Sequence, residues 1–122
     1  MNPEPATVVL DRDVLLERIG GDVEFLQEIA GLFLEECPKL VSEIHTAIAS
    51  GDAGALERAA HTLKGSVSNF AAQPASEAAR RLEMIGRTGQ LQEAPEACGA
   101  LETEIERFTL ALVALAGQLG VR

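Results

Sequence analysis

The chain has 122 residues, which suffice for one domain whose hydrophobic core needs neither disulfides nor metals. Hydrophobic residues make up 47% of the sequence but aromatic residues only 3%, so the core must consist mainly of Leu, Ile, Val and Ala, which favours packed helices over a β-sandwich. The net charge of −9 and the presence of only ten Lys and Arg residues argue against nucleic acids and anionic membranes as partners.

The N-terminal segment lacks the features of a signal peptide. We expect residues 1–7 to form a flexible leader and residues 8–122 to form a single domain. No apolar run approaches the roughly 20 residues of a membrane span, so we predict a cytoplasmic protein without membrane contact. Residues 8–19 predict a short helix that Asp11 caps and the Gly20-Gly21 pair ends.

The segment 22–49 predicts a long amphipathic helix that begins at Asp22, because aspartate is a favoured cap. Its apolar residues recur every three or four positions, as on one buried face, and they are Leu26, Ile29, Phe33, Cys37, Leu40, Ile44 and Ile48. Pro38 removes one amide donor inside this helix and predicts a kink near Leu34. Three further apolar residues lie off this face and either pack under the short N-terminal helix or form part of an apolar docking patch beside His61: Val23, Leu34 and Val41.

Three more helices are expected after short turns. The segment 53–70 predicts the third helix, capped by Asp52, and a fourth helix begins near Pro74, a residue suited to a first helical turn. We expect residues 86–89 to form the next turn, because both ends of this segment are glycine. The last helix should then run from about residue 92 or 95 to residue 119.

Four long helices with short connections, and no strand-like alternation of useful length, predict an all-α fold. The arrangement expected is an antiparallel up-down-up-down four-helix bundle, with the short N-terminal helix covering one end. Because such a bundle closes its own core, we expect a monomer.

The predicted third helix has an apolar face and a polar face. The apolar face consists of Leu56, Ala59, Ala60, Leu63, Val67 and Phe70, and the opposite face consists of Glu57, His61, Lys64, Gly65 and Ser68. His61 should therefore point outward, where its ring nitrogens are free for chemistry. At cell pH an imidazole is largely neutral and nucleophilic, which suits it to carry a phosphoryl group.

Two neighbours of His61 strengthen this interpretation. Gly65 lies one turn after His61 inside a helix, where glycine costs about 1 kcal/mol relative to alanine. A need for another protein to approach the ring closely would explain that choice. Lys64 lies on the same side, where an ammonium group can neutralise a phosphoryl group. A bare helix surface offers no metal site and no groups that surround the transferred phosphoryl group, so the partner must supply them.

The run from His61 to Ser66, which reads His-Thr-Leu-Lys-Gly-Ser, resembles the motif of histidine phosphotransfer (Hpt) domains of two-component phosphorelays. Further similarities occur in the segments 21–33, 51–60 and 82–83 and at Asn69. The resemblance extends over roughly residues 10–119.

This resemblance implies that His61 is phosphorylated on Nε2, that Lys64 supports the phosphoryl group, and that Gly65 and Ser68 leave access for the partner. It also implies that the partners are response-regulator receiver domains and a sensor or hybrid histidine kinase. Mg²⁺ is then expected on the receiver domain, with no metal and no cofactor on this chain. Many family members have glycine in place of Ser68 and of Ala71, which leaves partner choice and the local helix ending open.

Three other functions compete with that of a phosphocarrier. The phosphoacceptor domain of a sensor kinase would have an acidic residue directly after the histidine and a proline five residues after it, where this chain has Thr62 and Ser66. An enzyme with His61 as general base needs a pocket and a convergent acid, and Glu57 is the only carboxylate expected nearby. We therefore expect no enzymatic activity. The remaining alternative is a helical adaptor that binds a signalling partner without phosphorylation.

We expect structural rather than functional roles for the two cysteines and the second histidine. Cys37 and Cys98 lie far apart and have no CxxC partner, so we expect buried hydrophobic residues rather than a metal site or redox pair. His45 falls beside the core face of its helix and should be a boundary or surface residue. A basic stretch on the fourth helix is expected to pair with nearby glutamates: Arg80, Arg81 and Arg87 with Glu77 and Glu83.

Overall fold

The computed structural model describes residues 8–120. This part of the chain forms five α-helices and one 3-10 helix and contains no β-strand, which confirms the predicted all-α fold. In chain order the elements are α1 (Arg12–Arg18), α2 (Val23–Ser50), α3 (Ala53–Ser68), α4 (Gln73–Thr88), the 3-10 helix η2 (Leu91–Glu93) and α5 (Ala94–Gly120). The predicted leader, residues 1–7, lies outside the described residues, as do residues 121–122.

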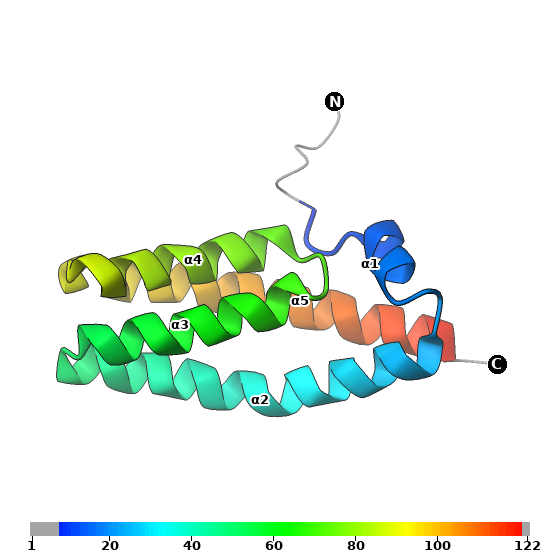
Figure 1. Ribbon diagram of the computed structural model, residues 1–122, viewed down its shortest axis with the longest axis horizontal. Helices are drawn as coiled ribbons and strands as arrows, with labels where there is room; N and C mark the ends of the chain where they lie inside the picture. The colour runs from blue at the N-terminus through cyan, green and yellow to red at the C-terminus, as the bar shows by residue number, and fades with distance from the viewer. Residues whose placement is uncertain (1–7, 121–122) are drawn as a thin grey trace.

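The four long helices lie side by side, and each runs opposite to the one before it (Figure 1). α3 packs against α2 and α4, and α5 packs against the same two helices. α2 remains helical through Pro38, and the kink expected near Leu34 stays a prediction. None of the helices in the described part combines the length and apolarity that crossing a membrane requires.

Three aspartates begin helices as predicted. Asp11, Asp22 and Asp52 each accept a hydrogen bond from the backbone N–H three residues later, at 3.1, 2.9 and 3.0 Å. Each cap satisfies an amide donor that the start of a helix leaves free, which typically stabilises a helix by about 1 kcal/mol. Gly51 follows the last residue of α2 and Gly89 follows the last residue of α4, and glycine adopts their positive φ angles of 69° and 78° without strain.

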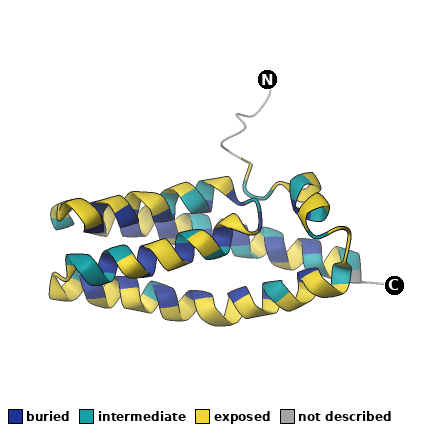
Figure 2. Ribbon diagram, in the orientation of Figure 1, coloured by how far each residue is buried: buried dark blue, intermediate teal, exposed yellow. Residues whose placement is uncertain are grey.

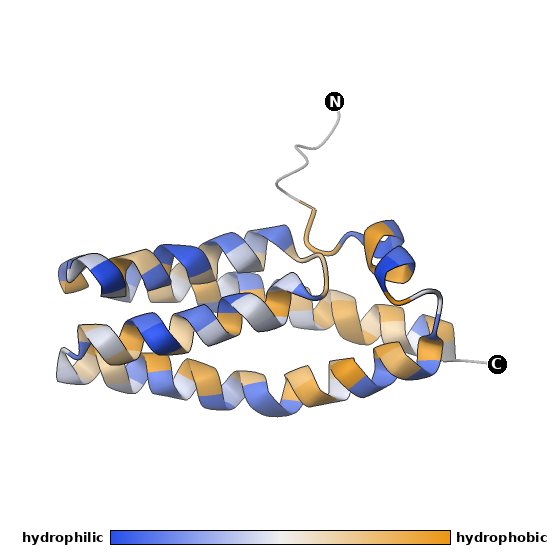
Figure 3. Cartoon of the chain, in the orientation of Figure 1, coloured by the Kyte–Doolittle hydropathy of each residue, from blue (hydrophilic) through white to orange (hydrophobic). Residues whose placement is uncertain are grey.

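The core lies between the four long helices, where buried and hydrophobic stripes face inward (Figures 2 and 3). Three of the four phenylalanines meet there. The rings of Phe33, Phe70 and Phe108 contact one another at centroid distances of 5.1–5.6 Å, in edge-on or tilted arrangements favourable for aromatic pairs. The predicted apolar face of the third helix is buried throughout: Leu56, Ala59, Ala60, Leu63, Val67 and Phe70.

The short helix α1 is fastened to the connection between α3 and α4. Leu15 of α1 is fully buried. The backbone N–H of Asp11 donates to the Ala71 carbonyl at 3.1 Å, and the Arg18 guanidinium donates to the Ser68 carbonyl at 2.8 Å. Ala71 has a φ of 56°, in the left-handed region that favours glycine. This conformation gives a physical reason why the family that the sequence resembles often has glycine there.

The fourth helix is longer than predicted, because Gly86 lies inside α4 and does not begin a turn. Gly86 is buried against α3. A Cβ atom at this position would lie 2.6 Å from the backbone nitrogen of Glu57 and 2.8 Å from the carbonyl oxygen of Ala53. The glycine therefore serves the close approach of the α3 and α4 backbones rather than a chain reversal, which begins only at Gly89.

We predict that Gly86→Ala destabilises the fold by about 1–3 kcal/mol, since the added methyl group overlaps backbone atoms that cannot move alone. Gly99→Ala is the matched control, because Gly99 is an exposed glycine within α5 and a Cβ there meets no atom of residues 8–120 within 4 Å. That variant should be unchanged or more stable, owing to the higher helix propensity of alanine. Urea unfolding of both variants measures the difference, and equal stabilities would contradict the proposed reason for Gly86.

Candidate functional site

His61 lies on the outer face of α3, as the sequence predicted. Its side chain is 67% exposed, whereas two near neighbours in the sequence, Ala60 and Leu63, are fully buried. The exposure follows from the helical period, because the apolar residues of α3 turn toward the core and carry His61 to the opposite side. The ring is thus accessible to another protein.

Glu83 on α4 is the principal contact of His61, a neighbour that was not predicted from the sequence. One carboxylate oxygen of Glu83 lies 2.6 Å from His61 Nδ1, and the other accepts a hydrogen bond from Lys64 Nζ at 2.6 Å. The Glu83 side chain is only 4% exposed, so it is the sole charged residue in the buried set of the described chain. The expectation that Glu57 is the only carboxylate near His61 was therefore wrong.

The ionisation of Glu83 follows from these contacts. The hydrogen bond from Lys64 lowers the pKa of the Glu83 carboxyl most, burial raises it, and the His61 hydrogen bond and the nearby charges lower it further. The net effect is a pKa below the ordinary value, so Glu83 is a carboxylate at neutral pH. A carboxylate only accepts hydrogen bonds, and the nitrogen that faces it must carry a proton.

This constraint selects the tautomer of His61. With the proton on Nδ1, the neutral ring has its lone pair on Nε2. Within residues 8–120 there is no hydrogen bond to Nε2. The geometry therefore presents an exposed, unprotonated nitrogen outward while a buried carboxylate holds the ring from behind, the arrangement required of a nucleophilic imidazole.

A second ion pair borders the site. Arg87 donates from Nε to Glu57 at 2.9 Å, and its Nη2 atom lies 3.4 Å from Glu83. The predicted pairing of Arg87 with Glu83 is confirmed, whereas Arg81 pairs with Glu96 of α5 instead of a neighbour on α4. The carboxylate of Glu83 thus faces three groups that are cationic or can donate a proton.

Gly65 and Ser68 lie on the exposed side of α3, but their settings differ. A Cβ atom on Gly65 would meet nothing within 4 Å in the described part of the chain, so packing among these residues does not require glycine there. Ser68 is engaged: its hydroxyl donates to the Lys64 carbonyl at 2.7 Å and lies 2.8 Å from the Ser76 hydroxyl. Ser68 therefore helps to join the end of α3 to α4, in addition to being small.

A signal for Glu83 was present in the sequence. The buried residues of α4 include Ala75, Ala79, Leu82 and Gly86, and Glu83 falls four after Ala79 and three before Gly86. A carboxylate at that spacing lies on the buried face of a helix, where it requires cationic or hydrogen-bonding partners. The partners themselves, 19 and 22 residues away on α3, became evident only from the packing of the two helices.

Comparisons with known proteins indicate the family of the chain. Residues 28–110 match the family model described as Hpt domain, a stretch that includes His61, Lys64 and Glu83. The chain is also similar to the crystal structure of histidine-containing phosphotransfer protein B (HptB) from Pseudomonas aeruginosa PAO1. The two share 26% sequence identity with a TM-score of 0.85, over 92% of this chain and 97% of that one. No curated protein sequence matches the chain.

We predict that Glu83→Gln removes the preference of His61 for the tautomer with its proton on Nδ1, because an amide can donate to Nδ1 as well as accept from it. Nitrogen-15 NMR of the neutral ring should show the native protein mainly with the proton on Nδ1 and the variant with an increased Nε2–H population. The matched control is Glu77→Gln, which changes an exposed carboxylate on the same helix and should leave the ring spectrum unchanged. A native ring with its proton mainly on Nε2 would contradict the inference.

Proposed function

This chain belongs to the histidine phosphotransfer (Hpt) domain family, and we propose that His61 is the residue that carries the phosphoryl group. The protein is a histidine phosphotransfer protein of a two-component phosphorelay, a family whose members exchange phosphoryl groups with receiver domains and kinases. The observation that carries the assignment to His61 is the Nδ1 contact with buried Glu83, which leaves Nε2 exposed and nucleophilic.

The proposed transfer is a direct displacement at phosphorus. The lone pair of His61 Nε2 attacks the phosphorus of an aspartyl phosphate on the receiver domain, and the bond from phosphorus to the aspartate oxygen breaks as the N–P bond forms. The aspartate leaves as a carboxylate, and the Nδ1 proton of His61 stays on the ring, held by Glu83. Glu83 then stabilises the positive charge that develops on the imidazole. The reverse displacement passes the group to another receiver.

Lys64 has two roles in this proposal. In the structure its ammonium group contacts Glu83 at 2.6 Å, so it offsets part of the cost of burying that carboxylate. Its side chain is still 29% exposed and projects from the turn of α3 that follows His61. We expect the same positive charge to attract the phosphoryl group on Nε2, which is the supporting role expected from the sequence.

The catalytic groups are proposed to come from the partner. His61 stands on a convex helix surface, and no second nucleophile or acid faces its Nε2 atom among the described residues. We therefore infer a phosphocarrier rather than an enzyme, with Mg²⁺ bound by the receiver domain. A receiver would dock on the exposed side of α3 and on the adjoining apolar residues of α2, where Phe25 and Leu32 are 45% and 57% exposed beside Ser66 and Asn69.

The proposal also covers the helix arrangement, the domain bounds, the oligomeric state and the cellular compartment. We infer an antiparallel four-helix bundle of α2 to α5 with α1 closing one end, supported by the alternating helix directions and by the α1 contacts to Ser68 and Ala71. Residues 8–122 would form one domain, acting as a monomer in the cytoplasm. The chain's own kinase and regulator would be identified by transfer assays.

We predict that a phosphorylated receiver domain with Mg²⁺ transfers phosphate to the native chain and not to His61→Gln. Intact mass should increase by one phosphoryl group that is lost in acid, and peptide mapping should place it on the segment containing His61. Circular dichroism of the variant establishes that it is folded. A folded native chain that accepts phosphate from no receiver in a broad panel would contradict the carrier role and favour the unphosphorylated adaptor.

We predict opposite effects of Gly65→Ala on stability and on transfer. The variant should be more stable by up to about 1 kcal/mol, because the position is helical and the new Cβ meets no atom within 4 Å. Transfer from the receiver should nevertheless be slower, because the methyl group lies where the partner must approach the ring. Gly99→Ala should show the gain in stability without the loss of transfer. Unimpaired transfer by Gly65→Ala would contradict the access role of Gly65.

A further inference from the structure

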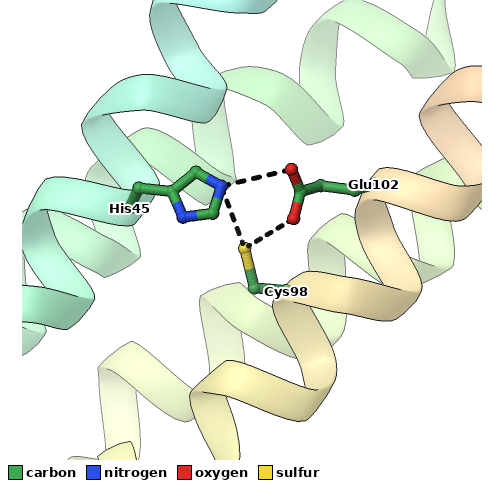
Figure 4. A group of neighbouring side chains, drawn as sticks. All are labelled: His45, Cys98 and Glu102. Carbon is green, nitrogen blue, oxygen red and sulfur yellow. Dashed lines mark hydrogen bonds and ion pairs between the residues drawn. The ribbon is translucent and has the colours of Figure 1, made fainter.

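Three side chains that commonly bind metals meet between α2 and α5, the helix pair that does not include His61 or Glu83 (Figure 4). His45 projects from α2, and Cys98 and Glu102 project from successive turns of α5. His45 Nε2 lies 3.2 Å from a carboxylate oxygen of Glu102 and 4.0 Å from the sulfur of Cys98. The Cys98 sulfur lies 3.8 Å from the other carboxylate oxygen.

These distances suit a tetrahedral cation of the size of zinc. With bonds of about 2.3 Å to sulfur and about 2.1 Å to nitrogen or oxygen, tetrahedral donors lie roughly 3.4–3.6 Å apart. His45 Nε2 lies 3.2 Å from one Glu102 oxygen and 4.0 Å from the Cys98 sulfur, both within a few tenths of an ångström of that range. The sulfur lies 3.8 Å from the other oxygen of the same carboxylate, and one ligand atom from each residue gives a set within 4.8 Å, so side-chain rotations would complete the geometry. The four-residue spacing of Cys98 and Glu102 holds two of the donors on one face of α5.

The burial of the three groups indicates a site with one open position. Cys98 is only 3% exposed and forms the floor, whereas the side chains of His45 and Glu102 are 55% and 47% exposed and form the rim. Three protein ligands would leave the fourth position for water or another small ligand. A shallow groove continues from the rim between α2 and α5, lined in part by Leu34 and Val41, a location that neither sequence-based alternative for these residues expected.

The donor chemistry narrows the class of cation. A sulfur, an imidazole and a carboxylate favour zinc and similar transition metals over Mg²⁺ and Ca²⁺, which prefer oxygen ligands alone. Burial and then the neighbouring Glu102 carboxylate raise the pKa of the Cys98 thiol to about 11, so without a cation the thiol is protonated at neutral pH. Binding would therefore release the thiol proton to solvent as the metal–sulfur bond forms.

We propose that His45, Cys98 and Glu102 bind a zinc-like divalent cation that cross-links α2 to α5. This inference revises the sequence-based expectation of no metal and does not depend on the phosphotransfer role of His61. A cation held by both helices would stabilise the folded chain, because the unfolded chain does not bring the three donors together.

The test is titration of the purified, metal-free chain with Zn²⁺ and with Co²⁺, whose spectrum reports the ligands. We expect one equivalent of Co²⁺ to give a sulfur-to-cobalt charge-transfer band together with intense visible bands of tetrahedral coordination, and Zn²⁺ to displace it. Zn²⁺ should also raise the melting temperature of the native chain.

Variants identify the ligands. Cys98→Ala should lose the charge-transfer band, while Cys37→Ala, the matched change at the other buried cysteine, should keep it. His45→Gln and Glu102→Gln alter exposed positions that do not threaten folding, and each should weaken zinc binding by more than roughly 10–100-fold, the usual effect of losing an outer-shell partner. Absence of the band in the native chain, or unchanged binding in Cys98→Ala, would overturn the proposal. Binding lost in His61→Gln but kept in His45→Gln would place the metal at the other histidine and overturn it equally.

Discussion

The site depends on the burial of one carboxylate, that of Glu83, between α3 and α4. A buried carboxylate without partners is expensive, and Glu83 is tolerated because Lys64 and His61 each satisfy one of its oxygens at 2.6 Å. The same contacts keep it ionised, and its ionisation dictates the proton on His61 Nδ1. Folding energetics and chemical reactivity are thus linked through a single group. The contacts that offset the cost of burying Glu83 also keep the proton of His61 on Nδ1 and leave the lone pair on Nε2.

The position of Glu83 in turn depends on how closely the two helices approach. Gly86, one turn later on the same face of α4, has no room for a Cβ because the backbone of α3 lies against it. This contact brings the α4 backbone near Glu57. His61 lies one turn after Glu57 on α3, so Glu83 comes within reach of it. Gly65 is the converse case: among the described residues nothing lies within 4 Å of a Cβ placed there, which supports the proposed role of this glycine in partner access.

Much of this structure was predictable because it is encoded locally. The aspartate caps and the three- and four-residue spacing of apolar residues gave the helix starts and the outward direction of His61, which the structure confirms. Local patterns could not show what lies across a helix interface. A glycine that packs against a neighbouring backbone and a glycine that ends a helix look alike in sequence, so Gly86 was misassigned to a turn. His45 and Cys98 are 53 residues apart and share no short motif.

The nearly balanced charges around His61 fit the proposed role of a phosphocarrier better than that of an enzyme. Before phosphorylation, two carboxylates, Glu57 and Glu83, lie beside two cations, Lys64 and Arg87, so the surroundings are close to neutral. A phosphoryl group on His61, the proposed acceptor, would add nearly two negative charges that this balanced set only partly offsets. A strongly cationic site would hold the group and oppose its departure, whereas a carrier must release what it accepts. In the proposed mechanism the chain therefore contributes an oriented nucleophile and a moderate electrostatic field, and the partner that binds it supplies the strong stabilisation of the transition state.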